Sequence, residues 1–350
     1  MSGIPSRKRE HVELSLGAEA LYQDRTNGFE AWDFEHVALP ELDFDEIDTT
    51  TEFLGKRLAF PLLVTGMTGG YAGAGRINAA LAEACEEAQV ALGVGSQRQM
   101  LLSDEHVATF RVVREHARHI PVLANIGGAE VARMRNVDDA LRLVECIGAD
   151  ALAVHLNPLQ EFLQPEGNPQ FRGVLAGISM LVRALPVPVV VKEVGAGITA
   201  AVARRLHEAG VRIIDVAGAG GTSWARIEAQ RRAAQLPAVS AAFLDWGVPT
   251  AEALREIHAA ALEGTQLIAS GGIADGVMIA KAIAMGATLA GAARPVLAAL
   301  DAGGPEGLAF LLTSWKNDVQ GVMFLTGAAT VAELATRPLR RSIHTSGHPS

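Results

Sequence analysis

The sequence predicts an α/β fold, a (β/α)8 TIM barrel with an N-terminal extension and C-terminal helices. Short apolar runs recur along the chain, and each leads through a glycine-rich or polar corner into a segment with helical spacing. The runs are continuously apolar, as expected of strands buried on both faces, and many successive corners stand about 30 residues apart, the length of a βαβ unit. Parallel strands alternating with helices therefore predict a closed barrel, with strands in residues 60–65, 90–96, 121–127, 151–157, 188–195, 211–218, 265–272 and 287–294.

The eight runs divide the chain into three parts. Residues 1–59 do not fit the repeat and are predicted to form an extension that contributes a substrate-binding arm. Residues 60–335 are predicted to form the barrel, with an insertion around 223–249 after the sixth strand and one or two closing helices within 304–335. Long loops inside compact domains are commonly functional. The last segment, 336–350, is predicted to be a mobile tail.

Composition excludes several classes of protein. The 350 residues carry a formal net charge of −9, which argues against a nucleic-acid partner. Cys85 and Cys146 are the only cysteines, too few for a disulfide scaffold or a zinc ribbon. The N-terminus is polar from its first residues, and no uncharged window reaches the ~20 apolar residues of a membrane helix. We therefore expect a cytoplasmic protein with no membrane partner.

Paired glycines follow the last two predicted strands. Gly271 and Gly272 precede a helical segment that begins at Asp275, and Gly291 leads through two alanines to Arg294. Such corners present backbone N–H groups at a helix N-terminus, and the corresponding loops of barrels commonly hold a phosphate. The alternative is that these glycines only make tight turns.

Lys192 ends a buried apolar strand, where a lysine is costly unless it is paired or used. Three roles fit this position equally well. Lys192 forms a Schiff base, neutralises a cofactor anion, or pairs with Glu193 or Asp215.

Two further groups of residues have both a functional and a structural interpretation. His155 and Glu161 belong to a polar corner after the fourth strand, where Glu161 suits Mg²⁺, which takes one or two carboxylates besides substrate phosphates. The structural alternative is a hydrogen-bonded barrel histidine and a carboxylate that favours a helix start. The basic cluster Arg7–His11 is either a solvated arm or an arm that folds over the barrel mouth to bind an anion.

Taken together, the corner motifs match a known family. They read RKREH at 7–11, MTGG at 67–70, GSQR at 95–98, HLNPLQE at 155–161, VKEVG at 191–195, DVAGAGGTSW at 215–224, ASGGI at 269–273 and ARP at 293–295. Over nearly its whole length the chain resembles the type 2, FMN-dependent isopentenyl-diphosphate isomerases. The resemblance implies interconversion of isopentenyl and dimethylallyl diphosphate, with reduced FMN, Mg²⁺ and a nicotinamide reductant, usually NADPH, and a homo-oligomer.

The resemblance also implies roles for individual residues in cofactor binding. The phosphate of FMN would lie on Gly271, Gly272, Ala293 and Arg294. A lysine near the pyrimidine edge of the flavin favours the anionic reduced ring, which suits Lys192. The remaining flavin contacts would come from Thr65, Met67, Thr68, Gly69, Ser96, Asn125, Lys192 and Thr222.

For the substrate, the resemblance implies that Glu161 ligates a Mg²⁺ bridging the diphosphate. Gln160, which also contacts the substrate, would lie beside the reacting alkene, and Gln160 and His155 are the candidate catalytic residues. The corners offer few conventional acid/base pairs, so we expect reduced flavin to be the proton donor and acceptor. The diphosphate itself would be held by Arg7, Lys8, Ser96, Arg98 and His155.

Two alternatives stay open from the sequence. An FMN-dependent 2-hydroxy-acid oxidoreductase shares the barrel and the phosphate site, but it needs a base late in the barrel, and no histidine lies between His258 and His344. A noncatalytic barrel that binds a phosphate ligand is disfavoured by the density of polar corners.

Overall fold

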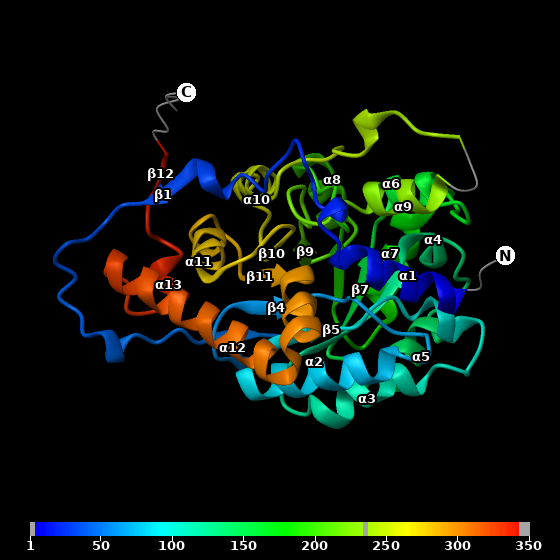
Figure 1. The fold of residues 1–350 in the computed structure, drawn as a ribbon, viewed down its shortest axis with the longest axis horizontal. Coiled ribbons are helices and arrows are strands. Elements are labelled where there is room, and N and C mark those ends of the chain that lie inside the picture. The colour runs from blue at the N-terminus through cyan, green and yellow to red at the C-terminus, as the bar shows by residue number, and fades with distance from the viewer. Residues whose placement is uncertain (1–3, 234–236, 343–350) are drawn as a thin grey trace.

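One closed barrel of parallel strands forms the centre of the molecule. The computed structural model describes residues 4–233 and 237–342. Each barrel strand pairs with the next along the chain, and the last pairs with the first (Figure 1). The predicted barrel is confirmed, and every predicted run contains one strand: β4 Leu62–Val64, β5 Ala91–Gly93, β6 Val122–Gly127, β7 Ala151–His155, β8 Val189–Lys192, β9 Ile213–Asp215, β10 Gln266–Ser270 and β11 Leu289–Ala292.

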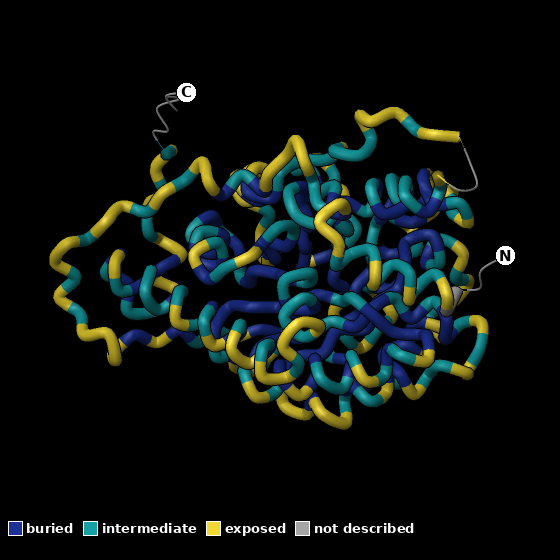
Figure 2. Tube along the Cα trace, viewed as in Figure 1, coloured by how far each residue is buried: buried dark blue, intermediate teal, exposed yellow. Residues whose placement is uncertain are grey.

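Helices cover the outside of this barrel, one after each strand. Their apolar faces pack on the outward side chains of the strands. In Figure 2 the trace at the centre of the molecule is mostly dark blue, the colour of buried residues. Amphipathic helices bury one stripe in this way and leave the opposite face to solvent. The ring consists of α2 Ala74–Ala88, α3 Ala108–His116, α5 Asp138–Cys146, α7 Val174–Ala184, α8 Ala200–Glu208, α10 Thr250–Ala259, α11 Gly276–Ala284 and α12 Arg294–Thr326.

The last helix of the ring is long and apolar. Among the described residues, α12 is the one helix whose length and composition would let it cross a membrane. Its helical geometry breaks at Gly304, where φ is 61°. Beyond the break Leu308, Trp315 and Val319 recur with helical spacing and are buried, and the helix packs on α2 and α11. Together with the short α13 (Val331–Leu334), α12 makes the closing helices that the sequence predicts.

A hairpin of the N-terminal extension closes the bottom of the barrel. Strands β2 (Thr51–Phe53) and β3 (Lys56–Leu58) pair antiparallel. Phe53 and Leu58 are buried in one cluster with inward side chains of the barrel strands, such as Leu63. This cluster fills the barrel interior with apolar side chains, so any ligand site has to lie at the other end.

The opposite end, where the strands have their carboxyl termini, is covered by helix α1 (Ile4–Leu16), which lies across the front of Figure 1. The segment after β9 also lies at this end. It contains α9 (Trp224–Arg232) and a short 3-10 turn at Ala241–Phe243, which matches the expected insertion. Two short helices, α4 (Gly128–Val131) and α6 (Pro158–Leu163), follow β6 and β7 there.

The start of the predicted tail is ordered, in contrast to the sequence prediction. Leu339–Arg341 forms strand β12, which pairs antiparallel with β1 (Trp32–Phe34), and Figure 1 shows the pair at the upper left. The guanidinium carbon of Arg341 also lies 5.6 Å from the centre of the Trp32 ring. The prediction missed this strand because its partner stands far away in the sequence and three residues carry no periodic signal. Residues 343–350 of the predicted tail lie outside the described residues.

Candidate active site

A layer of polar side chains forms the floor of the site. Successive side chains of a strand point to opposite faces, so the residue two places after an inward apolar residue also points inward. Leu63, Leu123, Val190, Ile213 and Ile268 belong to the apolar cluster inside the barrel. Two places after each, at the carboxyl end of its strand, stands a polar residue: Thr65, Asn125, Lys192, Asp215 or Ser270.

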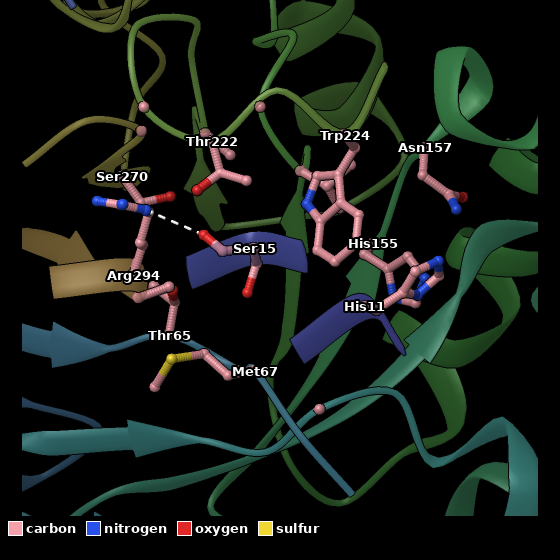
Figure 3. A pocket seen from close by; sticks show the side chains of 18 of the residues that line it. His11, Ser15, Thr65, Met67, His155, Asn157, Thr222, Trp224, Ser270 and Arg294 are labelled. Carbon is pink, nitrogen blue, oxygen red and sulfur yellow. Dashed lines mark hydrogen bonds between the residues drawn. The ribbon is translucent and has the colours of Figure 1, made fainter. Parts of the chain in front are cut away.

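A cavity of about 440 Å³ lies above this floor and beneath α1. Its volume is in the range of small-molecule and cofactor sites, roughly 300–1,000 Å³. Figure 3 shows side chains from opposite sides of the barrel facing this space, with His11 and Ser15 of α1 among them. All the residues that the sequence analysis assigned to the site line this one cavity: Arg7, Lys8, Thr65, Met67, Thr68, Gly69, Ser96, Arg98, Asn125, His155, Gln160, Glu161, Lys192, Thr222, Gly271, Gly272, Ala293 and Arg294.

The glycines at one side of the cavity allow backbone segments to touch. A Cβ atom at Gly271, whose φ is 109°, would lie 2.2 Å from the carbonyl oxygen of Gly218. One at Gly221 would lie 2.5 Å from the backbone nitrogen of Gly272. Backbone amides bare of side chains, beside the N-terminus of α12, suit a phosphate. The buried hydroxyl of Thr68 lines the same cavity and has no hydrogen-bond partner among the described residues. These residues fit the phosphate and a polar edge of FMN.

Arg294 has a contact that the sequence did not indicate. Its Nε donates a hydrogen bond to the carbonyl oxygen of Ser15 (3.0 Å), drawn as the dashed line in Figure 3, and its Nη2 donates to that of Leu16 (2.8 Å). Carbonyl groups at a helix C-terminus have no partner within the helix and carry partial negative charge. Arg294 therefore joins the phosphate side of the cavity to the end of α1.

His155 is a neutral imidazole in the free protein. Its Nδ1 lies 2.7 Å from Oδ1 of Asn125, and Nδ2 of Asn125 donates to the carbonyl oxygen of Val94 (2.9 Å). Because Asn125 accepts through Oδ1, we assign the proton of His155 to Nδ1, which leaves Nε2 as an acceptor. Burial and the positive charges of Lys192 and Lys8 lower the pKa of His155 to about 3.

Arg7, Lys8 and His11 of the basic cluster line the cavity at the barrel mouth, whereas the side chain of Arg9 is exposed. Nζ of Lys8 donates to the carbonyl oxygens of Gly69 (2.7 Å) and Ser96 (2.5 Å). Burial, with the neighbouring charges of Arg7 and Arg98, lowers the pKa of Lys8 to about 7. Of the two sequence interpretations, the geometry favours an arm folded over the mouth.

Carboxylates stand next to these cations. Nε of Arg98 lies 3.0 Å from Oε1 of Glu130, and burial raises the pKa of this carboxyl. Glu161 is buried, and its carboxylate accepts from Nδ2 of Asn157 (3.2 Å) and from the backbone N–H of Asn168 (2.6 Å). No group of three or more His, Cys, Asp or Glu residues in the described chain is arranged to hold a metal. A single carboxylate suits Mg²⁺ only if phosphate oxygens complete its coordination.

Gln160 is held in one orientation by Asn157, which belongs to its own corner motif, and by Glu228, which the sequence-based prediction missed. Its Oε1 accepts from Asn157 Nδ2 (3.1 Å), and its Nε2 donates to Oε1 of Glu228 on α9 (3.0 Å). Glu228 is fully buried, pairs with Arg231 (2.7 Å) and lies 2.9 Å from Nε2 of His11. The only sequence signal for Glu228 and Arg231 is the predicted insertion at 223–249. It follows the sixth strand and so lies at the same end of the barrel as the site.

Comparison with known proteins shows to which family the chain belongs. The family model of FMN-dependent dehydrogenases matches residues 2–123 and 129–341. The isopentenyl-diphosphate delta-isomerase of Pelodictyon phaeoclathratiforme is 46% identical over 351 residues, 97% of each chain. That of Cronobacter sakazakii is 52% identical over 295 residues, 84% of this chain and 85% of the relative. The chain belongs to the isopentenyl-diphosphate delta-isomerases within the FMN-dependent dehydrogenase family.

Membership confirms the resemblance read from the corner motifs, identifies the protein as an isomerase and supports FMN as its cofactor. Solved structures of mandelate oxidase variants are also similar. One with benzaldehyde has a TM-score of 0.67 at 21% identity, covering 97% of this chain and 98% of that one. Another, with 3,3,3-trifluoro-2,2-dihydroxypropanoic acid, has a TM-score of 0.68 at 21% identity, covering 97% and 95%. At this identity the likeness shows the fold alone, which is the predicted barrel.

Proposed function

We propose that the protein interconverts isopentenyl diphosphate and dimethylallyl diphosphate in the cytoplasm, using FMN, Mg²⁺ and NADPH. The observation that supports this most is the presence of two anion-binding sides in one cavity. The glycine loops and Arg294 stand after β10 and β11, while His155 and the cations around Arg98 stand at the opposite rim. A flavin phosphate and a substrate diphosphate therefore have separate places, with the polar floor between them.

Each cofactor has a defined part in this proposal. Reduced FMN, when bound, supplies the proton donor and acceptor for adding a proton at one carbon of the allyl unit and removing one from another. NADPH would provide its reduction, although the isomerisation itself is redox-neutral. Lys192 would place a positive charge at the pyrimidine edge of the ring, which favours the anionic reduced flavin.

The protein side chains bind, orient and screen the substrate. Arg7 and Arg98 offer guanidinium groups, which match phosphate oxygens in a bidentate way. The amide of Gln160 cannot rotate without breaking its bonds to Asn157 and Glu228, so it presents a fixed face to the alkene. Helix α1 covers the mouth and excludes water. Glu161 would hold the Mg²⁺ through one carboxylate, the diphosphate providing further oxygens.

An anaerobic assay tests this function. Protein reconstituted with FMN, Mg²⁺ and NADPH is expected to convert isopentenyl diphosphate to dimethylallyl diphosphate with many turnovers for each NADPH oxidised. Protein that takes up no FMN would point to the noncatalytic phosphate-binding barrel. A yellow protein that oxidises a 2-hydroxy acid and leaves isopentenyl diphosphate unchanged would support the oxidoreductase alternative instead.

The homo-oligomer is part of the same proposal. Phe310 on α12 is 77% exposed, and its neighbour on the helix surface, Thr313, is exposed as well. Contiguous exposed apolar patches often mark interfaces, whereas one exposed apolar side chain is normal on a soluble protein, so the proposed oligomer rests on the family resemblance. Light scattering of the purified protein measures the mass, and a mass near 36.8 kDa, that of one chain, would contradict an oligomer.

A further inference from the structure

A buried carboxylate lies at the floor of the site and has no part in the mechanism above. Asp215 ends β9 and is 1% exposed. Its Oδ1 accepts three hydrogen bonds, from the hydroxyl of Ser270 (2.7 Å) and from the backbone N–H groups of Ser270 (3.2 Å) and Ala217 (3.3 Å). Its Oδ2 has no hydrogen-bond partner among the described residues. A buried polar atom left unpaired is costly, so its retention needs an explanation.

The position of Asp215 relates it to the predicted flavin site. A second cavity, of about 10 Å³, lies inside the barrel. Thr65, Asn125 and Lys192 line both this cavity and the large one, so they form the partition between the two. Asp215 lines only the small cavity and therefore lies on the far side of the partition from the flavin site.

Lys192 is the cation that the strand pairing places beside Asp215. Strands β8 and β9 pair in a register that places Lys192 opposite Asp215. Nζ of Lys192 donates to the backbone carbonyl of Glu193 (2.5 Å), and the two side chains are not within ion-pair distance in this structure. The ammonium and carboxylate groups thus share the floor as separate charges.

Burial raises the pKa of the Asp215 carboxyl above its usual range, and the charge of Lys192 and the hydrogen bonds from Ser270 and Ala217 act in the opposite direction. The geometry supports the ionised form, because all three hydrogen bonds at Oδ1 are donated to the carboxyl and Lys192 stands opposite it in the strand register. Donated hydrogen bonds and a nearby cation both favour a charged carboxylate. A purely structural role, tying β9 to β10 through Ser270, explains Oδ1 only. An asparagine would accept the same bonds without placing a second, charged oxygen in the barrel.

We propose that Asp215 is a positioning residue that acts as the counter-charge of Lys192 beneath the flavin. Lys192 stabilises negative charge on the reduced ring, and Asp215 partly offsets that effect. The pair would set how strongly the site favours reduced over oxidised FMN. This inference rests on the proposed flavin site, so it is measured only on protein that has visibly taken up FMN.

The test is the midpoint potential of bound FMN in Asp215→Asn. Removing a negative charge below the ring should stabilise the anionic reduced form and shift the potential to more positive values. We expect at least a tenfold change in the reduction equilibrium, about 30 mV for a two-electron couple. Lys192→Gln should shift the potential the other way. Glu193→Gln is the matched control, since Glu193 is also a buried carboxylate next to Lys192 but lines neither cavity.

An unchanged potential in Asp215→Asn, or an equal shift in Glu193→Gln, would overturn the proposal. If Asp215→Asn takes up no FMN, the unaltered holoprotein decides. Its infrared difference spectrum on flavin reduction, with and without ¹³C-labelled aspartate, should show no carboxylic acid C=O band at neutral pH. An aspartate band of that kind would mean that Asp215 is protonated and carries no charge to offset Lys192.

Discussion

The hydrogen bonding and protonation of single residues in this site depend on neighbours that are distant in sequence. Lys8 is held by two carbonyls, Gly69 and Ser96, that belong to different barrel loops. The sequence identified Lys8 as part of a basic cluster but left open whether it is solvated, because exposure depends on where α1 folds. The same holds for His155, whose partner Asn125 lies on the neighbouring strand β6. Residue types at strand ends were predictable, whereas their protonation was not.

The pKa of Lys8, about 7, leads to a pH dependence of anion binding. A diphosphate binds the charged form of Lys8. Below about pH 7 this ammonium group is already present, whereas above pH 7 the neutral amine has to take up a proton when the anion binds. We expect the Kd for inorganic diphosphate to rise by up to tenfold per pH unit above about pH 7. Titration calorimetry of the FMN-loaded protein measures this.

The comparison variant is Lys8→Met, which should remove that part of the pH dependence while the ligand's own titration remains. Arg9→Ala is the control, because Arg9 lies on the same helix with its side chain 67% exposed. Identical pH profiles for the wild type and Lys8→Met would contradict the assignment.

Gly271 supports a prediction about the phosphate loop. In Gly271→Ala the added Cβ would meet the carbonyl of Gly218 at a positive φ, a strain of about 1–3 kcal/mol before any contact with ligand. We expect the Kd for FMN, followed by flavin fluorescence, to rise more than tenfold. Gly321 lies on α12, and a Cβ atom there would meet no atom within 4 Å. Gly321→Ala should therefore bind FMN normally, and its free energy of unfolding should rise by about 0.5–1 kcal/mol. Normal FMN affinity in Gly271→Ala would refute a close approach at this loop.

At the scale of elements, the sequence predicts the helices and strands that are indicated by the pattern of their own residues. Continuous apolar runs located all eight barrel strands, although the runs extend past the strands into the corner loops. Strands β1 and β12 were missed, because three-residue strands depend on a partner at the other end of the chain. Helix α9 was foreseen only as part of an insertion, so its buried Glu228 could not be placed next to Gln160.

Helix α1 is held from both sides, and this is testable by hydrogen exchange. Arg231 of α9, 3% exposed, contacts Glu10 (2.8 Å), and Arg294 binds the carbonyls of Ser15 and Leu16 at the other end. Hydrogen bonds from charged groups contribute roughly 1.5–3 kcal/mol each. In Arg294→Met we therefore expect the amides of α1 to exchange at least tenfold faster.

Arg255→Met provides a matched control, because Arg255 is an exposed arginine on α10 that stacks on Trp32 of β1 (4.1 Å to the ring centre), away from the cavity that α1 covers. The amides of α2 serve as an internal reference in both variants. Unaltered exchange of α1 in Arg294→Met would show that Arg294 does not hold the helix.

At the scale of the whole molecule, closure of the barrel is what assembles the site. Strand ends separated by many residues become neighbours around one rim, and the polar floor forms because the side-chain period of two is the same in every strand. This is why the set of site residues could be predicted while their contacts could not. The barrel also places the phosphate side and the diphosphate side opposite each other. Helix α1 spans the space between them and contacts both.

Because α1 contacts both sides, binding of FMN and of diphosphate should be coupled. Arg294 stands beside the glycine loops and holds the end of α1, and Lys8 on the same helix lies at the diphosphate side. We expect FMN to tighten the binding of inorganic diphosphate by about fivefold or more, and diphosphate to tighten FMN by the same factor, as linkage requires. Calorimetric titrations in both orders give this factor.

Arg294→Met should reduce this coupling factor towards one even if the affinity for FMN itself falls, because the factor is a ratio of affinities. Arg255→Met should leave the factor unchanged. A factor of one in the wild type, or a factor that survives in Arg294→Met, would mean that the two sides act independently.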